Sequence, residues 1–145
     1  MKKNLLVIIP VYNEQNNIKP IVLKIFKEIK RKVNILFIDD NSQDKTRSQI
    51  YLCKKKYKKI YLIKRGSKLG IGSAHKCGLK WGYLKKYKTI VTMDCDGTHD
   101  PKHIKKMLIK IQNSDLVISN RFLKKNSLKG WDIKRKIITK LRYYL

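Results

Sequence analysis

Short apolar runs alternate along the chain with segments whose apolar residues recur every three or four positions. The runs at 5–10, 33–38, 60–63, 89–93 and 116–119 predict five strands, because strands buried on both faces are continuously apolar. The clearest helical face comprises Ile18, Ile21, Val22, Ile25, Phe26 and Ile29. Strands and helices that alternate without internal repeats predict an α/β fold with a mostly parallel sheet.

Glycines and prolines mark the boundaries of the other predicted helices. These helices are expected over about 44–56, from the loop 66–72 to about 85, from Pro101 onward, and over 131–145. The glycine loop has neither the spacing of a P-loop nor the position of a dinucleotide fingerprint, so we interpret it as a turn and helix N-cap. Gly78 and Gly82 lie one turn apart and predict that this helix closely approaches a neighbour.

Composition adds less than its extreme charge suggests. The 145 residues are enough for one domain with a buried core, and their net charge of +26 is typical of proteins with anionic partners. Lysines outnumber arginines 30 to 6, however, and Ile, Asn and Tyr are abundant. An AT-rich coding sequence would give this composition without selection for binding, so the charge alone does not identify a partner.

Cysteines and apolar runs bear on the cellular compartment. Cys53, Cys77 and Cys95 form no CxxC pair, which predicts a reducing compartment without a disulfide framework or zinc site. No apolar run approaches the roughly 20 residues of a membrane helix, and 5–9 is too short for a secretory signal. Any membrane contact is therefore expected to be peripheral, or to involve a segment outside this chain.

Acidic residues are scarce and clustered. Eight of the ten are Glu14, Asp39, Asp40, Asp44, Asp94, Asp96, Asp100 and Asp132. Three groups of them follow predicted strands, and ligands of parallel sheets bind at the carboxyl ends of the strands. We expect about five carboxylates to converge there, which requires a cation or a set of donors among them.

The pair Asp94-x-Asp96 fits a hard divalent cation, Mg²⁺ or Mn²⁺, that also holds diphosphate oxygens. A lone DxD is also common as a turn or a helix cap. Its position after an apolar strand, opposite two other acidic strand ends, favours the metal. The histidines His75, His99 and His103 do not repeat at metal-ligand spacing and are interpreted as structural or solvated.

Five segments resemble motifs of family 2 glycosyltransferases and cover essentially the whole chain in the family's order. They are 8–14 (IIPVYNE), 38–46 (IDDNSQDKT), 68–74 (KLGIGSA), 93–101 (MDCDGTHDP) and 130–139 (GWDIKRKIIT). The last three are similar to the dolichyl-phosphate mannose synthase branch. Asn41 and Lys45 stand where the second motif usually has glycine, and Gly97 and Thr98 where the branch has leucine and serine.

The resemblance implies a GT-A fold, a Rossmann-like three-layer arrangement with one nucleotide-sugar-binding domain. Its nucleotide-binding core would be 1–119, with an acceptor-side loop and amphipathic helix at 120–145. The implied reaction is inverting, metal-dependent transfer of mannose from GDP-mannose to dolichyl or another polyprenyl phosphate. Such an enzyme serves protein glycosylation and is expected in the cytoplasm, peripherally on the cytosolic face of a membrane.

Carried over position by position, the resemblance also implies residue roles. The donor would contact Pro10, Tyr12, Glu14, Ile38, Asp40, Met93, Asp94, Cys95, Asp96 and Arg121, with Met93 and Cys95 lining the site by their backbone. The metal ligands would be Asp94 and Asp96, with Thr98 as a candidate third oxygen. The acceptor phosphate would be bound by Arg121, Arg135 and Thr139, since the guanidinium fork suits oxyanions. A prenyl phosphate is already an anion and needs no general base, so catalysis would depend on residues that manage charge. These would be Asp96, Arg121 and Arg135.

Three alternatives stay open at this point. One is transfer from another nucleotide sugar, such as a UDP-sugar, to undecaprenyl phosphate. Another is a basic nucleic-acid-binding module, which would interleave aromatic and basic residues on one sheet face; the third is an inactive fragment. Sequences with these motifs continue past the last one, so we expect a fold incomplete at its C-terminal end. Transfer would then need a partner chain to supply the closing segment.

Overall fold

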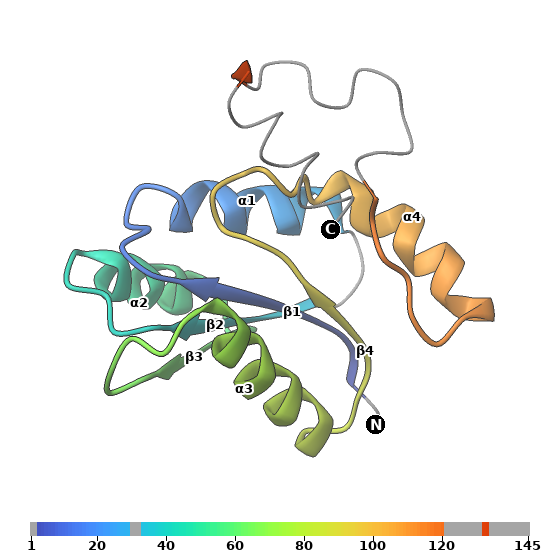
Figure 1. Cartoon of the computed structure of the whole chain (residues 1–145), viewed down its shortest axis with the longest axis horizontal. Coiled ribbons are helices and arrows are strands. Elements are labelled where there is room, and N and C mark those ends of the chain that lie inside the picture. Colours follow the sequence, from blue (N-terminus) through green and yellow to red (C-terminus); the bar gives the residue numbers. More distant parts are fainter. Residues whose placement is uncertain (1–2, 30–32, 121–131, 134–145) are drawn as a thin grey trace. The chain divides into compact units, whose positions relative to one another are not determined.

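The structure, a computed structural model, describes residues 3–29, 33–120 and 132–133. The chain divides into two compact units, Met1–Lys110 and Ile111–Leu145. In the first unit the elements are β1 (Lys3–Val11), α1 (Ile18–Glu28), β2 (Val33–Asp39), α2 (Thr46–Lys56), β3 (Ile60–Lys64), α3 (Ile71–Leu84), β4 (Tyr87–Thr92) and α4 (Lys102–Lys110) (Figure 1). The second unit begins with the 3-10 turn Ile111–Asn113.

The four strands form one parallel sheet in the order β3-β2-β1-β4. In its register Leu6 of β1 lies between Asn34 of β2 and Ile90 of β4. The chain builds the sheet outward from β1 in one direction and then returns to the other side of β1 for β4. The predicted α/β class is therefore confirmed. A switch point between β1 and β4 lies at the carboxyl ends of both strands.

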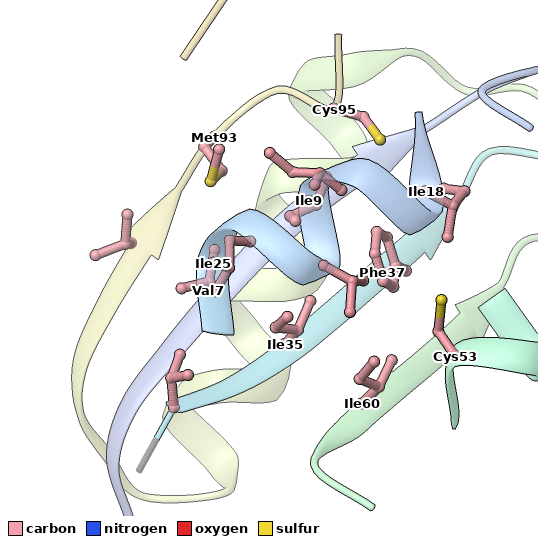
Figure 2. Close-up of a cluster of buried hydrophobic side chains, with 14 of the residues drawn as sticks. Val7, Ile9, Ile18, Ile25, Ile35, Phe37, Cys53, Ile60, Met93 and Cys95 are labelled. Atoms are coloured by element: carbon pink, nitrogen blue, oxygen red, sulfur yellow. The ribbon is translucent and has the colours of Figure 1, made fainter. Parts of the chain in front are cut away.

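Helices cover both faces of the sheet because successive β1 side chains point to opposite sides. Leu6 and Ile8 face α3, where they pack with Ala74. The intervening Val7 and Ile9 belong to the opposite core (Figure 2), to which α1, α2 and α4 contribute Ile18, Ile21, Val22, Ile25, Ile50, Cys53 and Ile104. This three-layer packing holds the carboxyl ends of β1, β2 and β4 in fixed positions along one edge.

Helix α3 lies close against the sheet because it carries glycine where a side chain would collide. A Cβ at Gly78 would lie 2.5 Å from Cγ2 of Ile8, and one at Gly82 would lie 2.7 Å from Cδ1 of Ile90. Carbon atoms in contact are normally separated by about 3.5 Å or more. The predicted close approach of this helix is confirmed, and its partners are strand side chains.

The fifth predicted strand, at 116–119, is wrong. Residues 116–120 form no strand, and the sheet of the described residues contains four. A short apolar run has the composition of a strand but does not specify a pairing partner, and the partner decides whether a strand forms. The predicted helix at 131–145 lies outside the described residues apart from Asp132 and Ile133. No helix in the described part is long and apolar enough to cross a membrane.

Candidate functional site

A cavity of about 310 Å³ lies at the carboxyl ends of the parallel strands. The residues that line it come from the end of β1, from the loops after β1, β2, β3 and β4, and from the start of α3: Pro10, Val11, Tyr12, Glu14, Asp40, Lys68, Gly70, Ile71, Ala74, Asp94, Cys95 and Asp96. This is the switch point of the sheet, where ligands of open parallel sheets bind. Its volume is at the lower end of the range for small-molecule sites.

Most of the residues predicted to contact a donor are brought together here. Seven of them line the cavity: Pro10, Tyr12, Glu14, Asp40, Asp94, Cys95 and Asp96. Ile38 and Met93 do not, because their side chains are buried in the two cores. Arg121, Arg135 and Thr139 lie outside the described residues.

The loop after β1 is held by side chains of the loop after β2. Ser42 Oγ accepts the N–H of Asn13 at 3.0 Å, and Thr46 Oγ1 accepts the N–H of Glu14 at 2.7 Å. In the other direction, Asn13 Oδ1 accepts the N–H of Gln43 at 2.9 Å. The polar residues of the second motif therefore fix the loop that carries Glu14 to the cavity.

Asn41 stands where the resembled motif usually has glycine, and the backbone explains why it fits. Its φ is +66°, in the left-handed region that asparagine tolerates better than most residues. Its side-chain oxygen also accepts a hydrogen bond from Arg47 Nη2 at 3.1 Å. Lys45, the other replacement, has an ordinary φ of −79°, so no glycine is needed there.

Asp44 has a structural part in this network. Its carboxylate accepts the N–H groups of Gln15 at 3.2 Å and of Thr46 at 2.9 Å. Burial alone would raise the pKa of the Asp44 carboxyl, but the hydrogen bonds from Thr46 and Gln15 outweigh burial and lower the pKa below its usual value. The ionised form therefore stabilises the two loops.

Asp40 anchors the glycine loop 66–70. Its two carboxylate oxygens accept the N–H groups of Leu69 at 3.0 Å and Gly70 at 2.8 Å. Nη1 of Arg65 lies 3.0 Å from the same carboxylate, and the Asp40 and Arg65 side chains are only 6% and 8% exposed. Gly70, with φ +87°, is the N-cap residue immediately before α3, so the predicted turn and N-cap are confirmed.

The loop after β4 is folded on itself. Nδ1 of His99 accepts the N–H of Asp94 at 3.0 Å. Oδ1 of Asp96 accepts the backbone N–H of Thr98 at 2.9 Å and its hydroxyl at 2.7 Å. Gly97 has φ +81°, which accounts for glycine where the resembled motif has leucine.

Asp94 and Asp96 provide the kind of oxygen donors that Mg²⁺ and Mn²⁺ prefer, with the Thr98 hydroxyl beside them. Within the described residues, no three Asp, Glu, His or Cys side chains converge closely enough to hold a metal ion alone. Two carboxylates without a closed cage fit a cation that completes its shell with water and ligand phosphates, as Mg²⁺ usually does. The residues present therefore fit such an ion.

Three residues near the cavity were not predicted as functional. Lys68 lines it with Nζ 3.8 Å from the centre of the Tyr12 ring, Arg65 holds Asp40, and His99 holds the Asp94 backbone. The signal for Arg65 was the scarcity of arginine in a chain rich in lysine. His99 was visible within the resembled fourth motif. Lys68 opens the resembled third motif, in the glycine loop that we interpreted as a turn.

His75 of α3 is a further histidine close to this loop. Its Nδ1 is buried and has no hydrogen-bond partner among the residues that the structure describes. Burial lowers the pKa of His75 from its usual value, while the nearby Asp94 carboxylate opposes that effect. The ring is therefore held in its neutral form at physiological pH, consistent with the predicted structural role.

Comparison with known proteins gives a consistent family. Residues 6–144 match the family described as Glycosyl transferase family 2. The polyprenol monophosphomannose synthase of Mycolicibacterium smegmatis is 33% identical over 93% of this chain and 51% of its own length. The undecaprenyl-phosphate mannosyltransferase of Micrococcus luteus is 31% identical over 92% of this chain and 55% of its own. The chain thus spans about half the length of these curated relatives.

The fold has close counterparts among solved structures. A mannosyltransferase from Pyrobaculum calidifontis, solved with GDP-Man and Mn²⁺, superimposes with a TM-score of 0.65 at 17% identity. The match covers 89% of this chain and 39% of that one. At this identity the likeness establishes the GT-A type of fold, which confirms the fold that the motifs implied.

Proposed function

The chain belongs to glycosyl transferase family 2, and we propose that it binds GDP-mannose and transfers the mannose to a polyprenyl phosphate such as dolichyl phosphate. The observation that carries the proposal is the convergence of Glu14, Asp40, Asp94 and Asp96 around one cavity at the strand ends. Support for the sugar and the acceptor comes from the names of the relatives, which act on polyprenol or undecaprenyl phosphate.

In this proposal the two sides of the cavity bind different parts of the donor. The Tyr12 ring, 37% exposed, offers a flat apolar surface for the base. Asp94 and Asp96 would hold a divalent cation beside the diphosphate. A bound Mg²⁺ or Mn²⁺ would act as a Lewis acid that offsets charge on the diphosphate leaving group. Thr98 and His99 keep the two carboxylates in place by their hydrogen bonds to this loop.

The acceptor side of the proposal depends on Arg121, Arg135 and Thr139, which would bind the prenyl phosphate. That phosphate is already an anion near neutral pH, so it can attack the anomeric carbon without a general base, with inversion. Because the acceptor is a lipid, the site would work at the cytosolic surface of a membrane. A nucleic-acid platform is less consistent with the fold, since helices cover both faces of the sheet of described residues.

Thermal unfolding with competing nucleotides tests the donor. With Mg²⁺ present, GDP at about 100 times its dissociation constant should stabilise the protein by about 2.7 kcal/mol and raise Tm by roughly 5 °C or more. UDP at the same concentration should have a smaller effect. A larger increase in Tm with UDP would instead indicate that the donor is a UDP-sugar. If neither nucleotide raises Tm, the cavity is not a nucleotide-sugar site.

Sugar transfer tests the acceptor. In the presence of Mg²⁺ or Mn²⁺, and of the partner chain that transfer is expected to need, radiolabelled mannose from GDP-mannose should appear on a short polyprenyl phosphate. Arg135→Ala should then raise the Michaelis constant for the lipid far more than that for GDP-mannose. Arg135→Lys should recover the loss only in part, because an ammonium lacks the bidentate fork. A rise confined to the donor constant would show that Arg135 binds the nucleotide sugar.

A further inference from the structure

Lys68 is a cation held in place at the mouth of an acidic cavity. It directly precedes Leu69 and Gly70, whose N–H groups are bound by Asp40. The loop is therefore fixed next to Lys68 by a carboxylate that is itself buried and paired with Arg65. The Lys68 side chain remains exposed, and its Nζ lies over the Tyr12 ring, 3.8 Å from the ring centre.

Lys68 lies over the Tyr12 ring although several carboxylates line the same cavity. Of the described residues that line the cavity, four carry carboxylates and Lys68 alone carries a basic side chain. Among the described residues Lys68 forms no ion pair with any of these carboxylates. A cation on an exposed aromatic face gains only a modest amount of free energy, so a ligand can displace it. Lys68 is thus available to bind an anion that enters the cavity.

We propose that Lys68 is a further ligand-binding residue of this site and that it contacts the phosphate groups of a nucleotide. In this arrangement the ammonium leaves the Tyr12 ring when the ligand enters, and the base takes the face of the ring that Lys68 has left. An ammonium suits phosphate oxygens as a point charge, and an aromatic face suits a base. The inference rests on the proposed function, because it takes the ligand to be a nucleoside diphosphate.

The test separates phosphate from base by using ligands with and without the diphosphate. Lys68→Met removes the charge while it keeps the length and the apolar stem of the side chain. Binding of guanosine, GDP and UDP is measured by calorimetry, with Mg²⁺ and with a chelator. Lys80→Met, on the exposed face of α3 beyond the cavity lining, is the matched control for loss of one positive charge.

Lys68→Met should weaken GDP binding about tenfold, the scale of one charge-assisted hydrogen bond, and the loss should persist without metal. Guanosine should bind Lys68→Met as well as it binds wild type, or a few-fold more tightly, since no cation has to leave the ring. Lys80→Met should match wild type for every ligand. Wild-type GDP affinity in Lys68→Met would overturn the inference, and so would equal losses for guanosine and GDP, which would mark a structural role.

Failure of the proposed donor would look different. If the wild-type protein binds UDP and not GDP, the donor assignment fails, yet Lys68→Met should still weaken UDP binding about tenfold. If GDP binds equally well to wild type and Lys68→Met, the proposed donor is retained and the proposed phosphate contact of Lys68 is rejected. Absence of binding by both nucleotides to the wild-type protein would overturn the two proposals together.

Discussion

The two sides of the cavity are built in different ways. On the β2 side, which comprises the loops 12–17, 40–45 and 65–70, side-chain hydrogen bonds join residues 29 to 32 positions apart. On the β4 side, the loop 94–100, the hydrogen bonds that Asp94 and Asp96 make within the described part of the chain reach two to five positions along it. The first side is cross-linked between separate loops, and in the second the described hydrogen bonds of Asp94 and Asp96 stay within one loop, which Asp100 joins to Lys24 of α1.

Because of this difference, the two sides of the cavity are expected to differ in how far they are formed before a ligand binds. Asp40 on the β2 side is 5% exposed and fully engaged, so that side can hold its shape with the cavity empty. Asp94 on the β4 side is 36% exposed in its side chain and lies beside a second carboxylate. Two carboxylates so placed repel each other unless a cation joins them. In the proposed reaction the nucleoside would bind to the preformed side and the diphosphate to the side completed by metal.

Removal of one carboxylate from each side should give the largest contrast. Asp40→Ala removes the charged partner of the buried Arg65, which keeps only its neutral contacts with Gly70 and Ser73, and the free energy of unfolding should fall by about 3 kcal/mol. Asp96→Ala removes one of two neighbouring charges from an exposed loop, and the change should stay below about 1 kcal/mol in either direction. Denaturant unfolding at pH 7 measures both. Similar losses in the two variants would mean that the β4 side is as tightly built as the β2 side.

A smaller difference in stability is expected between two glycine variants of α3, one against β1 and one against β4 and β1. Gly78→Ala would bring a methyl group against Cγ2 of Ile8, close to the backbone of the central strand, and should cost about 2 kcal/mol. Gly82→Ala would meet the terminal carbons of Ile90 and Leu6, which can turn away. Its cost should be smaller, because these chain ends can move aside, while both variants recover up to about 1 kcal/mol of helix propensity. Thermal unfolding decides, and a larger cost at Gly82 would contradict this order.

The smallest effect concerns Asp100, which ties the β4 side to its surroundings. Its carboxylate accepts the N–H of Lys102 at the start of α4 and lies 3.3 Å from Nζ of Lys24 on α1. The Lys102 N–H is the main cause that lowers the pKa of Asp100 from 3.8 to about 2, and Lys24 adds to it. Asp100→Asn keeps an oxygen that can accept the Lys102 N–H but removes the charge that faces Lys24, so the free energy of unfolding at pH 7 should fall by at most about 1 kcal/mol, the scale of an exposed ion pair.

The sign of the pH dependence follows from the lowered pKa. A carboxylate with a depressed pKa stabilises the fold above the unfolded value and loses that effect as the pH falls through the folded value. The difference between wild type and Asp100→Asn should thus be full above about pH 4 and shrink toward pH 2. Unfolding curves between pH 7 and pH 3 test this. A difference that does not change with pH would mean that the asparagine amide, and not loss of the charge, destabilises the helix.

Much of the fold could be predicted because periodicity reports burial. Strands β1 and β2 and the helix face from Ile18 to Ile25 are buried as the apolar pattern indicates, whereas the edge strands β3 and β4 are only partly buried. The run at 116–119 failed because a strand is defined by its partner, and apolar composition does not name one. The close packing at Gly78 could also be predicted, since a glycine on a helix face indicates that a neighbouring element leaves no room for a side chain.

The site was only partly visible in the sequence. Strand-end position brought Glu14, Asp40, Asp94 and Asp96 together correctly, because parallel strands end at one edge of the sheet. The sequence did not show what each acidic side chain is bound to. Asp44 holds the two loops, and Asp40 holds the glycine loop as well as lining the cavity. These hydrogen-bond partners lie about 30 positions away along the chain, and the spacing of residues in the sequence does not predict such pairings.

The most direct test of the account is the dependence of GDP affinity on a divalent cation. Calorimetry of the wild-type protein with and without Mn²⁺ is compared with the same pair of titrations on Asp94→Asn/Asp96→Asn. We predict that Mn²⁺ tightens GDP binding to the wild type by roughly 10- to 100-fold, the scale of charged contacts in a partly dry site. The double variant should keep the weak metal-free affinity supplied by the β2 side and gain nothing from Mn²⁺. Equal tightening by Mn²⁺ in both proteins would contradict the role given to Asp94 and Asp96.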